Sequence, residues 1–176
     1  MLLLATKIAA APTRTDYHLT YPIDNATGTI YKPSEIPLAV VKPKAVSSQH
    51  PIRASHTISE DSLRRFLELH KSPLSGYSDL IAASPYASTI VGISAIEQRY
   101  CLLRPQSSPF NCWGMGGSRL KRYSGFPEAI QDIDGWLARH EAKYPTIESL
   151  NCYYVQPCSP NWLNTVLKVK AEVENL

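Results

Sequence analysis

The distribution of prolines divides this chain near residue 57, and that division limits how much of it can form a core. The first part has no apolar repeat longer than a few residues, and its prolines are scattered among Thr, Ser and Lys: Pro12, Pro22, Pro33, Pro37, Pro43 and Pro51. Prolines remove the backbone donors that a central strand needs, and this composition is typical of linkers. We therefore predict a Pro-rich extended N-terminal segment over residues 1–57 and one folded domain over residues 58–176.

The excess of basic residues lies in the first part of the chain. Residues 1–59 contain six Lys and Arg against three Asp and Glu, whereas residues 60–176 contain twelve of each. A neutral domain argues against an extended nucleic-acid interface, so we expect no nucleic-acid partner. No run of about 18 apolar residues occurs, which excludes a complete transmembrane helix in the chain as given.

The first eleven residues are apolar but make a poor signal peptide, because Lys7 interrupts them and no basic run precedes them. Two interpretations stay open. The segment is either the cut-down end of an export signal or membrane anchor, or a disordered terminus. We expect membrane attachment only through such an N-terminal anchor.

The four cysteines lie in the C-terminal half, at Cys101, Cys112, Cys152 and Cys158, and no two form a CxxC pair. Zinc sites usually present closely spaced ligand pairs, so we expect no metal. Two disulfides, most simply Cys101–Cys112 and Cys152–Cys158, would staple two loops and imply an oxidising compartment. Free buried thiols are the alternative. No P-loop, dinucleotide fingerprint or HExxH motif occurs, and we expect no cofactor.

After Thr57 the pattern changes to helices. Thr57 and Glu60 have the spacing of a capping box, and 3/4 periodicity follows. We predict helical segments from Thr57 to His70, from Tyr77 to Ala83, from Tyr86 to Arg99, from Ser124 to Pro145 and from Ser159 onward. A short turn is predicted from Thr146 to Leu150, and a long functional or stapled loop from Cys101 to Gly125.

One carboxylate shares the apolar face of the third predicted helix. Ile90, Ile93 and Glu97 are spaced i, i+3 and i+7, which places them on one stripe. Burial disfavours the charged form and raises the pKa of a carboxyl group. A carboxyl group protonated near neutral pH can give a proton to a departing glycosidic oxygen, so Glu97 is a candidate general acid. The alternative is a solvated glutamate, or one paired with Arg99 or Arg104.

Four segments occur in an order and spacing that resemble a known family. They are Ile93-Ser94-Ala95-Ile96-Glu97, Phe110-Asn111-Cys112-Trp113-Gly114-Met115-Gly116, Tyr123-Ser124-Gly125-Phe126-Pro127-Glu128-Ala129-Ile130, and Tyr153-Tyr154-Val155-Gln156-Pro157 with Pro160-Asn161-Trp162. Together they resemble bacterial endo-β-N-acetylglucosaminidase-like domains of the lysozyme-like superfamily over roughly residues 60–176. The resemblance implies a mainly α, lysozyme-like small helical domain with a long loop after the catalytic helix.

The resemblance also implies roles for individual residues. Glu97 would be the catalytic acid, with Tyr153 and Tyr154 in the catalytic cleft. The substrate-binding loop would consist of Asn111, Trp113, Gly114, Met115 and Gly116. In the functional interpretation the glycines let the backbone approach a sugar and Trp113 offers it an apolar face. In the structural interpretation the same residues form a tight turn pinned by a buried tryptophan.

Two features depart from the family. Gln98 follows the acid where the family usually has Ser or Thr, and no Asp or Glu lies between Glu97 and Glu128. Glycosidases usually need a second carboxylate, for which we favour Glu128 over Asp132 and Asp134. Glu128 would equally suit a helix N-terminus for dipole reasons. The other route is assistance by the N-acetyl group of the substrate, placed by Tyr153 or Tyr154.

From these observations we predict a monomeric, secreted or envelope-associated peptidoglycan hydrolase. It would cleave β-1,4 bonds at N-acetylhexosamine units of glycan strands. A non-catalytic wall-binding or phage-structural module is the first alternative, and a cytosolic helical adaptor with four reduced cysteines is the second. A cysteine protease using Cys112 and His140 is least favoured, because the sequence before Cys112 lacks the usual surroundings of such a nucleophile.

Overall fold

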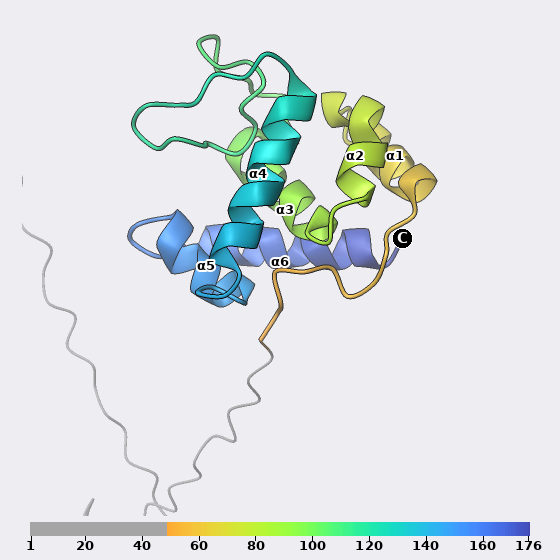
Figure 1. The fold of residues 1–176 in the computed structure, drawn as a ribbon. Coiled ribbons are helices and arrows are strands. Elements are labelled where there is room, and N and C mark those ends of the chain that lie inside the picture. The colour runs from red at the N-terminus through yellow and green to blue at the C-terminus, as the bar shows by residue number, and fades with distance from the viewer. Residues whose placement is uncertain (1–48) are drawn as a thin grey trace, which may run out of the picture. The chain divides into compact units, whose positions relative to one another are not determined.

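The computed structural model describes residues 49–176, in which helices follow one another around a single core (Figure 1). The elements are α1 (Glu60–Leu69), the 3-10 helix η1 (Pro73–Tyr77), α2 (Ser78–Ala82), α3 (Ala87–Gln98), α4 (Phe126–His140), α5 (Ile147–Tyr154) and α6 (Pro160–Glu174). The predicted mainly α class is confirmed. Within residues 49–176 none of the helices is long and apolar enough to cross a membrane.

α3 is the central helix of the bundle. Every residue from Ala87 to Ser94 is buried, which is typical of a helix enclosed on all sides. α6 runs along α3 in the most extensive helix contact of the structure. Gly92 permits this approach, because a Cβ atom there would lie 3.1 Å from the carbonyl oxygen of Val166. Glu97 therefore sits at the end of the most buried helix.

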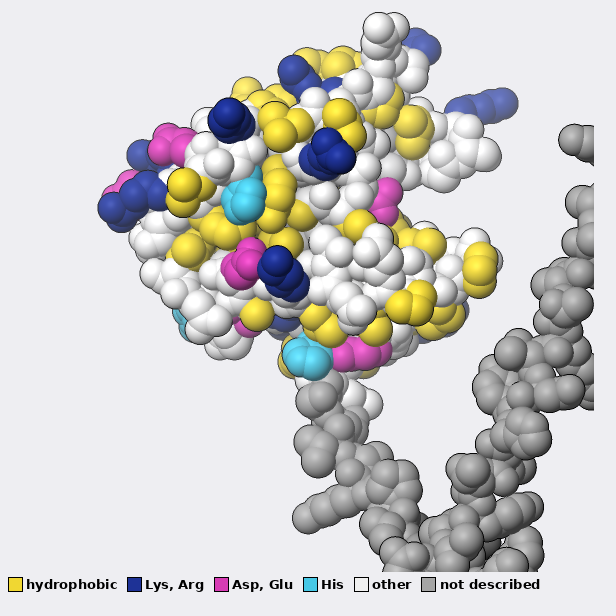
Figure 2. All heavy atoms as spheres, turned by 180° about the vertical axis from the view of Figure 1, so that it is seen from behind, with side chains coloured by type: hydrophobic (Ala, Val, Ile, Leu, Met, Phe, Trp, Pro, Cys, Tyr) yellow, Lys and Arg dark blue, Asp and Glu magenta, His cyan; other side chains and the backbone are white. Residues whose placement is uncertain are grey.

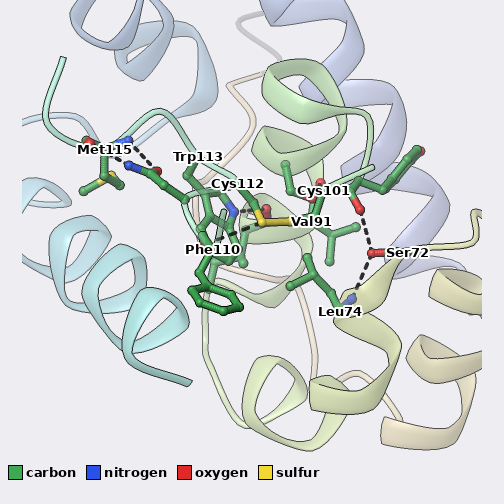
Figure 3. Close-up of a disulfide and its surroundings, with 12 residues drawn as sticks. Ser72, Leu74, Val91, Cys101, Phe110, Cys112, Trp113 and Met115 are labelled. Carbon is green, nitrogen blue, oxygen red and sulfur yellow. Dashed lines mark hydrogen bonds between the residues drawn. A yellow bond between two sulfur atoms is a disulfide. The ribbon is translucent and has the colours of Figure 1, made fainter. Parts of the chain in front are cut away.

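The chain leaves α3 through a sharp turn that a disulfide anchors. Arg99, Tyr100 and Cys101 all have positive φ, and Cys101 is joined to Cys112 with a Cα–Cα distance of 5.0 Å (Figure 3). The hydroxyl of Ser72 donates a hydrogen bond to the carbonyl oxygen of Tyr100 (2.8 Å), which ties the turn to the start of η1. These contacts fix both ends of the segment 101–112 to the core.

The second disulfide, Cys152–Cys158, connects α5 to the start of α6 across a Cα–Cα distance of 4.2 Å. Both pairs are those that the cysteine spacing favours. With Cys112 in a disulfide, the chain has no thiol nucleophile at that position.

One predicted helix boundary and one predicted turn are corrected. α1 begins after Ser59, whose hydroxyl accepts from the backbone N–H of Ser62, so Thr57 is not the cap. The predicted turn from Thr146 to Leu150 is the start of α5. Thr146 caps this helix in a reciprocal pair with Ser149, a residue that seldom takes the place of Glu or Gln there, so the helix start was missed.

The folded part also begins before residue 57. Ile52 is fully buried, its N–H donates to the carbonyl oxygen of Pro145 (3.0 Å), and its own carbonyl oxygen accepts from the Thr89 hydroxyl (2.6 Å). An isolated apolar residue next to Pro51 carries no periodic signal, which explains why the sequence places the boundary later. The predicted extended segment before residue 49 lies outside the described residues.

Candidate active site

The carboxyl group of Glu97 is half-buried in the last turn of α3. Its Oε1 accepts a hydrogen bond from the indole Nε1 of Trp162 on α6 (3.0 Å). On its other side a Cβ atom added to Gly114 would lie 3.3 Å from Oε2, so the carboxyl group lies close to the backbone of the long loop. Among the described residues no Lys, Arg or His forms an ion pair with it, so the alternative pairing with Arg99 or Arg104 is not observed.

The surroundings of Glu97 favour its protonated form. Burial raises the pKa of Glu97 above its usual range, and the hydrogen bond from Trp162 lowers it in part. A neutral N–H donor stabilises a carboxylate less than a cation does, so burial dominates. Glu97 therefore keeps its proton to higher pH than an exposed glutamate.

Tyr154 links the long loop to the helices around Glu97. Its hydroxyl donates to the carbonyl oxygen of Trp113. Its ring stacks on Trp162 at a centroid distance of 5.3 Å and meets the ring of Trp136 edge-on at 5.4 Å. Burial raises the pKa of Tyr154 well above its usual value, and the nearby charge of Glu97 raises it further. The phenol therefore remains a proton donor to the loop.

An open hollow of about 340 Å³ lies beside this cluster. It is lined by Gly114, Met115, Gly116, Gly117, Trp136, Tyr153 and Tyr154. The long loop and α5 project on the same side of the molecule in Figure 1, and Figure 2 shows the surface hollowed on that side. Larger hollows elsewhere on the described surface do not include Gly114 or Tyr154. The hollow thus adjoins the residues that contact Glu97.

Tyr153 presents an aromatic surface at the edge of the hollow. Its side chain is 39% exposed, and its ring stacks on Tyr144 at a centroid distance of 4.4 Å. Its hydroxyl lies 3.2 Å from Nε2 of His140, and its ring is nearly parallel to that of Trp136. Successive aromatic rings with polar edges are suited to the alternating apolar and hydroxyl surfaces of sugars.

Asn111 shapes the loop instead of facing the hollow. Its side chain is buried and donates to the carbonyl oxygens of Met115 (2.8 Å) and Lys121 (3.1 Å), while its Oδ1 accepts from the N–H of Met115 (2.9 Å). The turn that it closes contains Gly114 and Gly116 at φ of 64° and 98°, where side chains are disfavoured. Met115 contributes to the lining of the hollow with a mostly buried side chain.

The expected sugar-facing role of Trp113 is corrected. Its side chain is completely buried, and its Nε1 donates to the carbonyl oxygen of Ile90 (2.9 Å), so the ring pins the turn to α3 (Figure 3). The structural interpretation of the segment therefore holds for this residue. The tryptophan at the hollow is Trp136, and Trp162 holds Glu97. Both tryptophans follow the 3/4 spacing of an apolar helix face, and this spacing does not separate a core ring from one that lines a surface.

The candidates for a second carboxylate are occupied elsewhere. Glu128 is exposed and accepts from the N–H (2.7 Å) and hydroxyl (2.8 Å) of Ser124, which lower its pKa. Asp132 accepts from Lys121 and Tyr123 (2.7 Å each). Asp134 accepts from the hydroxyl of Ser84. None of the three lies next to Gly114, the lining residue that adjoins the carboxyl group of Glu97.

Around the hollow and Glu97 the structure brings together several residues of the predicted site, and it adds Trp136 and Trp162. The predicted residues found there are Glu97, Gly114, Met115, Gly116, Tyr153 and Tyr154. The structure separates Trp113 and Asn111 from the hollow and gives Glu128 the helix-end role that the sequence left open. Comparisons with protein-family models, with curated proteins and with solved structures found no match to this chain.

Proposed function

We propose that this chain is a peptidoglycan hydrolase with a lysozyme-like fold, in which Glu97 is the general acid for cleavage of a β-1,4 bond at an N-acetylhexosamine. One observation carries the proposal: a half-buried carboxyl group with a raised pKa lies between a neutral indole donor and the glycine-rich wall of an open hollow. Glycoside cleavage needs such an acid next to a sugar-sized space. The motif order that resembles glucosaminidase-like domains supports the same assignment.

The arrangement favours assistance by the substrate over a second carboxylate. Glu97 gives its proton to the glycosidic oxygen as the bond from that oxygen to C1 breaks. Because Glu128, Asp132 and Asp134 are occupied elsewhere, the acetamido oxygen of the sugar bonds to C1 in place of a carboxylate. Water then attacks C1 of the resulting five-membered ring, the bond between C1 and the acetamido oxygen breaks, and the water returns a proton to Glu97. This route restricts the substrate to N-acetylhexosamine polymers.

The two disulfides support an oxidising, extracytoplasmic location, where peptidoglycan is accessible. We further propose that the chain acts there as a monomer.

Digestion of purified peptidoglycan tests the proposal. The full chain should create new reducing ends, and borohydride reduction followed by mass spectrometry of the fragments identifies which amino sugar carries them. The occupied carboxylates favour a second candidate function, a non-catalytic module that binds the wall. Co-sedimentation with peptidoglycan without any new reducing ends would support that module and contradict the hydrolase.

Trp162→Phe should move the alkaline limit of activity to higher pH. The indole N–H stabilises the carboxylate form of Glu97, so its removal raises the pKa of this acid further. The protonated, active form then persists to higher pH, and the descending limb of the kcat/KM profile shifts upward. A pH–rate profile measures this shift. A limb that moves downward or stays in place would contradict the role of Trp162.

Gly114→Ala should reduce activity more than Gly117→Ala. Both glycines have similar positive φ, 64° and 59°, so both variants bear a backbone cost of about 1 kcal/mol. A Cβ at Gly114 crowds Glu97 Oε2, whereas a Cβ at Gly117 meets nothing within 4 Å. We expect kcat/KM to fall about tenfold for Gly114→Ala and less than about twofold for Gly117→Ala. Equal losses of kcat/KM would show that strain in the loop, and not contact with Glu97, sets the rate.

A further inference from the structure

The segment between Glu97 and Glu128 is strongly cationic. It contains no Asp or Glu, and its basic residues are Arg99, Arg104, Arg119, Lys121 and Arg122. Lys121 is paired with Asp132 on α4 at 2.7 Å, but among the described ion pairs none includes any of the four arginines. Their charges are therefore not neutralised by acidic side chains of the described domain.

Arg119 belongs to the turn that also forms a wall of the hollow, and Arg122 directly follows the residue that closes this turn. The turn is closed by backbone hydrogen bonds from Lys121 N–H to the Met115 carbonyl oxygen (2.8 Å) and from Arg119 N–H to the Gly116 carbonyl oxygen (3.2 Å). The ion pair between Lys121 and Asp132 attaches the end of this turn to α4. Arg119 is therefore held in a defined turn within a few residues of the glycines that line the first hollow.

A second hollow of about 530 Å³ adjoins this turn. It is lined by Ser107, Ser108, Ser118, Arg119, Leu120 and Arg122. Gly117 lines the first hollow and the next residue, Ser118, lines the second, so the two hollows share the tip of one turn. Two guanidinium groups and several serines make a set of donors that matches carboxylates, because each guanidinium presents a planar pair of N–H groups.

We propose that Arg119 and Arg122 bind carboxylates of the peptide stems of peptidoglycan while the glycan strand occupies the hollow beside Glu97. This inference rests on the proposed function. The adjacent residues Gly117 and Ser118 line the first and the second hollow, and an extended peptide spans about 3.5 Å per residue, so a peptide stem on a sugar in the first hollow is directed over this turn into the second. The site therefore selects glycan strands that carry anionic peptides over bare N-acetylglucosamine polymers.

Sedimentation with purified sacculi, freed of phosphate polymers by hydrofluoric acid, tests the inference. The full chain with Glu97→Gln serves as the binding probe, so that the wall is not digested during the assay. Adding Arg119→Gln and Arg122→Gln should weaken binding about tenfold, because two exposed charge pairs are lost. The matched control, Arg65→Gln with Lys168→Gln, removes the same charge from α1 and α6 and should leave binding unchanged.

Two further arms identify the ligand. Sacculi whose carboxyl groups have been amidated with a carbodiimide should bind the probe that carries Glu97→Gln alone only weakly. This binding should be as weak as that of native sacculi to the probe that also carries Arg119→Gln and Arg122→Gln. Without the Glu97 change, the double variant should still cleave N-acetylglucosamine oligomers at the wild-type rate.

Equal binding of native and amidated sacculi would overturn the inference. The inference would also be overturned if the double variant lost binding to phosphatidylglycerol vesicles but bound sacculi normally, because the arginines would then be assigned to a lipid surface. If the wild-type chain creates reducing ends in peptidoglycan but the double variant binds sacculi normally, the inference alone fails. If the wild-type chain creates none, the proposed function fails instead.

Discussion

Glu97→Gln is expected to lower the kcat for peptidoglycan cleavage by about 10³-fold, since positioned general acids contribute about 10²- to 10⁴-fold. The amide has nearly the same shape and still accepts the hydrogen bond from Trp162, but it has no proton to give to the departing oxygen. Glu97 has no ion-pair partner among the described residues, and burial raises its pKa, so replacing it with a neutral amide of similar shape should leave the fold intact. Release of reducing ends measures the rate, and circular dichroism checks the fold.

Glu128→Gln is the matched control for this variant. Glu128 contacts Ser124 at the start of α4, where its exposed charge interacts only weakly with the helix dipole because water screens it. We therefore expect its kcat to stay within about threefold of the wild-type value. If Glu128→Gln loses as much activity as Glu97→Gln, or if Glu97→Gln remains active, the assignment of the acid is wrong.

Trp113→Ala is expected to lower the free energy of unfolding by about 3–5 kcal/mol, the usual cost of truncating a large buried aromatic residue. Its ring is fully buried, and the variant also loses the hydrogen bond to the carbonyl oxygen of Ile90. The loop backbone that Tyr154 contacts would lose its attachment to α3. Urea unfolding of the full chain, followed by circular dichroism, measures the change.

Trp136→Ala should have the opposite pattern. This side chain is half-buried and lines the hollow, so we expect a loss of stability of about 1–2 kcal/mol and a fall of about tenfold in kcat/KM for N-acetylglucosamine oligomers. The comparison separates a structural tryptophan from one that contacts substrate. A stable Trp113→Ala chain, or a Trp136→Ala chain with unchanged kcat/KM, would reverse the two roles.

Helix periodicity accounts for most of what could be predicted from the sequence. The spacing of Ile90, Ile93 and Glu97 placed the carboxyl group at the end of a buried helix, and both isoleucines are fully buried. This prediction succeeds because side-chain direction in a helix follows from position alone. The two disulfide pairs could also be predicted from the sequence, because short intervening segments favour pairing between neighbouring cysteines.

The loop residues could not be placed in this way. A loop has no period, so nothing in the sequence shows that Trp113 points into the core while the neighbouring Gly114 faces Glu97. For Glu128 the sequence allowed two interpretations, a catalytic carboxylate and an acidic residue that stabilises the N-terminus of a helix. The structure shows it at the start of α4, in the second of these positions. The partnership of Trp162 with Glu97 joins residues 65 positions apart, which only the packing of α6 on α3 defines.

A crystal structure of the Glu97→Gln chain with an N-acetylglucosamine tetramer tests the central claim most directly. We expect the tetramer to lie between the Gly114–Gly117 turn and Tyr153, with one glycosidic oxygen within hydrogen-bond distance of the side chain at position 97. A tetramer bound on another face, or one separated from position 97 by the rings of Trp162 and Tyr154, would contradict the account.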